Sequence, residues 1–234
     1  LALRIYNKLR ENINDGKEWS EQNWRFLPQT VLTPTNTQAE KILEKLFALQ
    51  ASKLGWANQV PACSRHGHPE TRKMSIDLVC QNKPDTYEFI ELKVPSKTNN
   101  AFYASLEIMI YGIFYLLRDP ASDTTGKING KNISLKVLAP AEYYRGTNSK
   151  DMDTNAMEIL LNDDLKKFKQ EIQEINDTKV NFSFAFEEIN HIIFTKNENN
   201  IVREALWKLY KKSPGAIKQI IFARQRHNYN ESIA

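Results

Sequence analysis

Glycine and cysteine are scarce in this sequence of 234 residues, which contains 8 glycines and 2 cysteines. So few glycines argue against a glycine-rich loop of the kind that cradles nucleotide phosphates. Two cysteines cannot build a disulfide framework. We therefore expect Cys63 and Cys80 to be reduced core thiols in a cytoplasmic protein.

Long hydrophobic runs are also missing. The longest, Ala101 to Leu117, has 17 residues and contains Glu107. It is too short to span a bilayer comfortably, and a carboxylate in the hydrocarbon region is costly. No signal peptide is recognisable in the first residues. We expect no membrane partner.

Neither sign of charge dominates the whole chain, whose 32 Lys and Arg against 28 Asp and Glu give a formal net charge of +4. The surplus is local, because residues 201–234 carry seven basic and two acidic residues while residues 1–200 are nearly neutral. A basic end of this kind is either a solvated helix face or a contact for phosphates. The 41% hydrophobic content provides ample material for a core.

The order of apolar patterns predicts an α/β protein with a mixed β-sheet flanked by helices. We expect a single domain, with an amino-terminal helix and connector in residues 1–36, a core in 37–140, a further helix and strand in 141–200, and basic helices in 201–234. Helices are predicted over residues 2–24, 37–54, 101–117 and 152–176, and strands over 56–64, 73–81, 87–94, 133–138 and 180–187. The second of the two basic helices is expected to start at Ser213-Pro214.

Three residues that carry chemistry lie on two adjacent predicted strands. Strand side chains alternate between faces, so Glu91 and Lys93 share one face while their apolar neighbours share the other. Asp77 lies in an apolar strand that a hairpin would place beside Glu91. Burying such groups is expensive unless they pair or bind a metal, and two carboxylates suit Mg²⁺.

The residues Asp77 and Glu91-Leu92-Lys93 resemble the motif of the PD-(D/E)XK nuclease superfamily, with Ile76 in place of the proline. The order helix, three strands, helix, strand over residues 37–140 is similar to the restriction-endonuclease-like core. This resemblance implies a nuclease in which Asp77, Glu91 and the backbone carbonyl of Leu92 hold Mg²⁺ or Mn²⁺. It also implies that Lys93 assists the attacking water and that the partner is a nucleic acid, with DNA expected.

Further residues are candidates for a supporting role. Glu107 and Tyr111 resemble a Gln-x-x-x-Tyr motif that many of these nucleases carry on the following helix, with Glu in place of Gln. Glu107 would approach the metal, hydrogen-bond to Lys93 or contact DNA. The resemblance also suggests that Glu40 on the first core helix belongs to the site, although a capping box with Thr37 explains Glu40 without catalysis. The candidate phosphate contacts are Arg72, Lys73, Lys208, Lys211 and Lys212.

Other interpretations stay open. Asp85 precedes Glu91 more closely than Asp77 does, but it lies in a predicted turn, and a metal ligand is better placed on the sheet. Cys63, His66 and His68 suggest zinc only weakly, because no matching downstream pair follows. The ionic residues could tie strands together without any catalysis. The fold could also serve as an inactive module that binds nucleic acid, a protein partner or a second copy of the chain.

Overall fold

The computed structural model describes residues 1–12, 23–31, 38–51, 55–63, 74–94, 100–118, 126–145, 153–175, 179–189 and 224–226. Within them lies one mixed sheet of six strands, ordered β1 to β6 along the chain. The strands are β1 (Trp56–Cys63), β2 (Met74–Lys83), β3 (Thr86–Leu92), β4 (Asn132–Ala139), β5 (Asn181–Ile189) and β6 (Arg224–Arg226).

The first three strands form an antiparallel meander, and β3, β4 and β5 run parallel to one another. The β2–β3 hairpin pairs Leu78 with Ile90 and Lys83 with Thr86 around a turn at Pro84 and Asp85. Each parallel step needs a crossover, and a helix provides it in both cases. This α/β arrangement agrees with the fold class predicted from the sequence.

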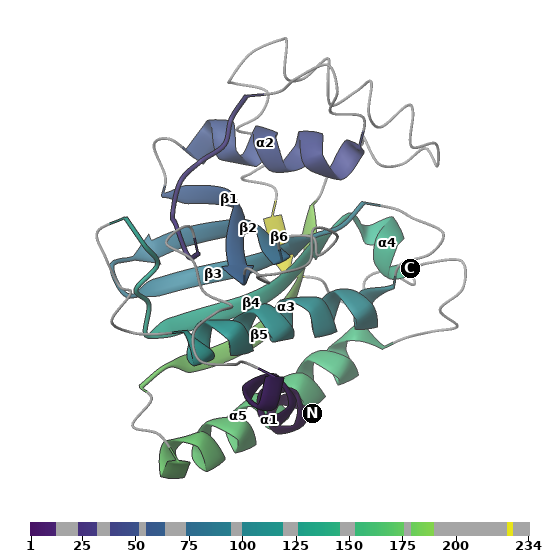
Figure 1. The fold of residues 1–234 in the computed structure, drawn as a ribbon. Helices are drawn as coiled ribbons and strands as arrows, with labels where there is room; N and C mark the ends of the chain where they lie inside the picture. Colours follow the sequence, from purple (N-terminus) through teal and green to yellow (C-terminus); the bar gives the residue numbers. More distant parts are fainter. Residues whose placement is uncertain are drawn as a thin grey trace.

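The helices cover both faces of the sheet (Figure 1). On one side lies α2 (Ala39–Ala51), and on the other lie α3 (Ala101–Leu117), α1 (Ala2–Asn12) and α5 (Thr154–Ile175). The short α4 (Ala141–Arg145) follows β4. Two apolar cores result: a smaller one under α2, which contains Ile90 and Leu92, and a larger one under α3 and α5, which contains Phe89.

The helix α3 lies very close to the sheet at Gly112. A Cβ atom added there would lie 2.9 Å from a methyl carbon of Leu135 on β4. One turn later, the Tyr115 hydroxyl donates to the carbonyl oxygen of Gly130 at 3.1 Å and accepts from its N–H at 2.6 Å. These contacts fix the position of α3, which carries Glu107 and Tyr111, against β4, the strand that pairs with β3.

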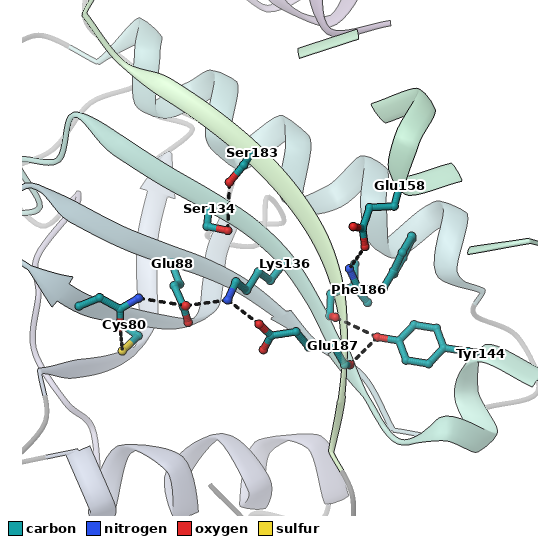
Figure 2. Close-up of polar contacts among 11 residues, drawn as sticks. Cys80, Glu88, Ser134, Lys136, Tyr144, Glu158, Ser183, Phe186 and Glu187 are labelled. Carbon is teal, nitrogen blue, oxygen red and sulfur yellow. Dashed lines mark hydrogen bonds and ion pairs between the residues drawn. The ribbon is translucent and has the colours of Figure 1, made fainter. Parts of the chain in front are cut away.

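Polar contacts join β3, β4 and β5 and also occupy a backbone N–H group of β5 (Figure 2). Lys136 on β4 bridges Glu88 on β3, at 2.6 Å, and Glu187 on β5. On the other side of β5, the carboxylate of Glu158 on α5 accepts from the N–H of Phe186 at 3.0 Å. This bond occupies a backbone donor that would otherwise be open to strand pairing with another chain.

Two expectations about elements are wrong. The first helix was predicted to reach residue 24, but α1 ends at Asn12, and Trp24 lies in a turn with φ of 61°. The reason is tertiary, because the Trp24 ring is buried against Phe89 and Tyr115. Helix was expected at the carboxyl end, yet Arg224–Arg226 pair with β5 as a strand. The remainder of 201–234 lies outside the described residues, as does the Thr37 capping box.

The two cysteines do not form a disulfide with each other, and both are buried in the described structure. In the part of the chain that the structure describes, no helix combines the length and the apolarity that crossing a bilayer would require.

Candidate metal centre

Asp77 lies within β2, directly beside β3. Its Oδ2 accepts the backbone N–H of Leu92 at 2.9 Å, a bond that fixes the carboxylate against the end of the neighbouring strand. The side chain is buried, with only 9% of its residue surface exposed. The pairing of β2 with β3 ends at Leu78 and Ile90, and one further step along each strand brings Asp77 beside Glu91.

Glu91 and Lys93 form an ion pair at the carboxyl end of β3. The Lys93 ammonium group donates to Glu91 Oε1, and both side chains are almost completely buried. The prediction that Glu91 and Lys93 share a face is consistent with this contact, since Ile90 and Leu92 pack into the core under α2. Glu91 Oε2 is buried as well, and no N–H or O–H group of the described residues donates to it. This oxygen is an unsatisfied acceptor inside the protein, which is costly unless something else binds it.

Glu107 extends the cluster onto α3. Its Oε2 lies 3.4 Å from Lys93 Nζ, and its Oε1 accepts the Tyr111 hydroxyl at 3.2 Å. Of the roles considered for Glu107, the structure therefore shows the contact with Lys93. Tyr111 is buried, whereas Tyr103, one turn before Glu107, is 63% exposed.

A second acidic group reaches the same place from α2. The carboxylates of Glu40, Glu44 and Asp77 each offer an oxygen, and these three oxygens lie within 4.8 Å of one another. Gln59 on β1 donates to Glu44 Oε2 at 2.7 Å and to Asp77 Oδ1 at 3.4 Å. Glu44 is 1% exposed and therefore internal, whereas Glu40 is only partly buried.

The pKa values reflect the crowding of acidic groups. Burial and the nearby charge of Asp77 raise the pKa of Glu40 to about 7. The same two causes raise the pKa values of Glu44 and Glu91 well above the ordinary range. Burial also raises the pKa of Asp77, against the lowering effects of Lys93 and the Leu92 N–H. Burial disfavours the charged form of Lys93, but the surrounding carboxylates outweigh it and raise its pKa.

The donor set fits a hard divalent cation. Within the part of the chain that the structure describes, buried and half-buried carboxyl groups face one another around the Lys93 ammonium group, and Glu91 Oε2 is left without a donor. A cation bound by Asp77 and Glu91 would satisfy that oxygen and offset the repulsion that raises these pKa values. Mg²⁺ or Mn²⁺ suits all-oxygen ligands of this kind. That the Leu92 carbonyl oxygen is a further metal ligand stays a prediction.

Other predicted residues are placed elsewhere or not described. Asp85 lies in the β2–β3 turn, where its carboxylate accepts the Thr86 hydroxyl at 3.2 Å, so it is not part of the cluster. Cys63 is buried, while His66 and His68 lie outside the described residues. The same is true of the five candidate phosphate contacts, Arg72, Lys73, Lys208, Lys211 and Lys212.

Two members of the cluster were not predicted from the sequence as site residues. Glu44 had a signal, because it is a carboxylate one turn after Glu40 and is flanked by Leu43, Leu46 and Phe47 on a mainly apolar helix face. Gln59 had none, since a glutamine in an ordinary half-buried strand is unremarkable. Its place depends on the pairing of β1 with β2.

Comparisons with known proteins add nothing to this geometry. No family model, curated protein or solved structure gives a match to the chain.

Proposed function

We propose that the protein is a metal-dependent nuclease that hydrolyses phosphodiester bonds in nucleic acid, with DNA as the expected substrate. The observation that carries the proposal is the buried Oε2 of Glu91, which receives no donor from the described residues, in a cluster where Asp77 and Lys93 also converge. An ion cluster that served only to join strands would be expected to pair its buried oxygens internally. The PD-(D/E)XK resemblance supports the same function.

In this proposal, Asp77 on β2 and Glu91 on β3 hold Mg²⁺ or Mn²⁺ where the two strands lie side by side. When bound, the cation would lower the pKa of a water ligand and offset charge that develops on the phosphate. The Leu92 N–H keeps Asp77 in place. Lys93 stays protonated between Glu91 and Glu107, where its ammonium group can orient the attacking water or stabilise negative charge. Tyr111 holds Glu107 through its hydroxyl.

The test is Mg²⁺-dependent cleavage of DNA and RNA oligonucleotides by the wild type, Glu91→Gln and Lys93→Met. Both variants are expected to lose about 100-fold or more in rate, because each removes a charge from the reacting centre. Lys167→Ala and Glu171→Ala are matched controls, since both side chains are exposed on α5, on the opposite side of the sheet from α2. Thermal unfolding checks that every variant is folded.

Undiminished cleavage by both Glu91→Gln and Lys93→Met would overturn the proposal. A wild type that binds nucleic acid but never cleaves it would instead support the alternative from another class, an inactive nuclease-fold module. If the protein bound no DNA or RNA at any salt concentration, the result would favour an ion cluster with a purely structural role.

A further inference from the structure

We infer that Gln59 is a positioning residue that sets the affinity of Asp77 for the divalent cation. The inference rests on the proposed function and extends it to β1, a strand to which neither the sequence motif nor the resemblance assigns a role. Gln59 does not need to touch the cation, because it acts through the Asp77 carboxylate.

The contacts of Asp77 divide its two oxygens between two donors. Oδ2 accepts the backbone N–H of Leu92 at 2.9 Å, and Oδ1 faces the Gln59 amide nitrogen at 3.4 Å. The same nitrogen donates to Glu44 Oε2 at 2.7 Å. One uncharged amide group therefore lies between two buried carboxyl groups and offers a hydrogen to each.

The backbone of β1 is unusual at the same residue. The backbone pairs Asn58 with Leu78 and Val60 with Ile76 place Gln59 opposite Asp77. Gln59 and Asp77 themselves do not form a backbone pair. Gln59 has a φ of 50°, in the left-handed region that costs a residue with a side chain about 1–2 kcal/mol. Such conformations persist where surrounding contacts enforce them, and they gather at functional sites.

The combination gives Gln59 a specific task. Glu44 and Asp77 come from a helix and a strand on different parts of the fold, and two carboxyl groups so close together tend to repel. The amide links them while leaving Asp77 fixed in one orientation. Groups that orient a metal ligand through a hydrogen bond typically change metal affinity by about 10- to 100-fold when removed.

The experiment is calorimetric titration of Mn²⁺ into the full chain, which measures binding without any reference to activity. The variants are Gln59→Gly, which removes the amide and tolerates positive φ, and Gln59→Met, which keeps the length but has no donor. The control is Gln81→Met, because the Gln81 amide donates to the Pro84 carbonyl oxygen at 3.1 Å at an exposed turn. Asp77→Asn shows whether binding depends on Asp77.

We expect both Gln59 variants to bind Mn²⁺ about tenfold more weakly than the wild type and Gln81→Met to bind normally. Thermal unfolding shows which Gln59 variants are folded. If a folded variant binds Mn²⁺ with an affinity within about twofold of the wild type, the inference is overturned and the proposed function is left intact. A role limited to structure would produce that result, with a lower unfolding midpoint and unchanged Mn²⁺ affinity. A wild type that binds no Mn²⁺ would overturn the proposed function, and this inference with it.

Discussion

The carboxyl groups around Asp77 lie where a bare negative charge is unfavourable. Burial and mutual repulsion raise the pKa values of Glu40, Glu44 and Glu91, and the positive charges of Lys41 and Lys93 offset this rise only in part. Binding of a divalent cation requires ionised carboxylates, so proton release and metal binding are coupled. The residues that make the site acidic are therefore also those that destabilise the metal-free protein at neutral pH.

Glu40 gives this coupling a measurable sign. Its pKa of about 7 in the folded protein exceeds the ordinary 4.5, so the native state binds the proton more tightly than the unfolded state does. The resulting stabilisation is fully present below pH 4.5 and is lost as the pH rises to about 7. We expect the free energy of unfolding of the metal-free wild type to fall over this range. The free energy of unfolding of Glu40→Gln should fall less.

Urea denaturation of both proteins at several pH values, with chelator present, measures this difference. It should be on the order of a few kcal/mol at most. Parallel pH profiles for the wild type and Glu40→Gln would show that Glu40 does not titrate in this way.

At the residue scale, the sequence predicted the positions that follow from strand alternation. Asp77, Glu91 and Lys93 meet because a hairpin aligns two apolar strands, and a charge in such a strand is visible in the sequence. Gln59 could not be predicted in this way, because its left-handed φ and its two carboxyl partners arise only when β1 and α2 pack beside β2.

Among the elements, α3 connects the larger core to the candidate site. Its bounds were predictable, since an uninterrupted apolar run begins at Ala101 and ends at Leu117. The bounds of α1 and the existence of β6 were not, because they depend on contacts between distant segments, such as Trp24 with Tyr115 and β6 with β5. Local periodicity carries no information about such pairings.

Gly112→Ala tests the close approach of α3 to the sheet. Alanine favours helix over glycine by about 1 kcal/mol, but the added methyl group would press on Leu135 at 2.9 Å. We expect a net loss of about 1–3 kcal/mol in the free energy of unfolding, as for other overpacked cores. Chemical denaturation measures it, and an increase in stability would show that Leu135 and β4 yield freely.

Across the whole molecule, the net positive charge and the candidate metal site lie in different parts of the sequence. The acidic cluster belongs to the nearly neutral first 200 residues, while the net positive charge comes from residues 201–234. A nuclease needs both a centre that binds a cation and a surface that attracts phosphates, and each suits a different local charge. The carboxyl-terminal region is thus expected to contribute affinity for nucleic acid and no chemistry.

The combined substitution of Lys208, Lys211 and Lys212 by alanine tests this division. If all three contact phosphates, the slope of log affinity against log salt concentration should become shallower by about 2–3. Alanine substitution of Lys166, Lys167 and Lys169 on α5 makes the same change in charge elsewhere and should leave the slope nearly unchanged. Equal slopes for both triple variants in fluorescence anisotropy titrations would argue against a phosphate-binding role for the carboxyl-terminal region.

The most direct measurement of the central claim is the position of a bound cation in crystals of the protein soaked in Mn²⁺. Anomalous scattering from manganese should give a peak within coordination distance of carboxylate oxygens of Asp77 and Glu91, with Glu91 Oε2 among the ligands. The account predicts loss of this peak in Asp77→Asn crystals. No peak at this cluster in the wild type, or a peak only at other residues, would contradict the account.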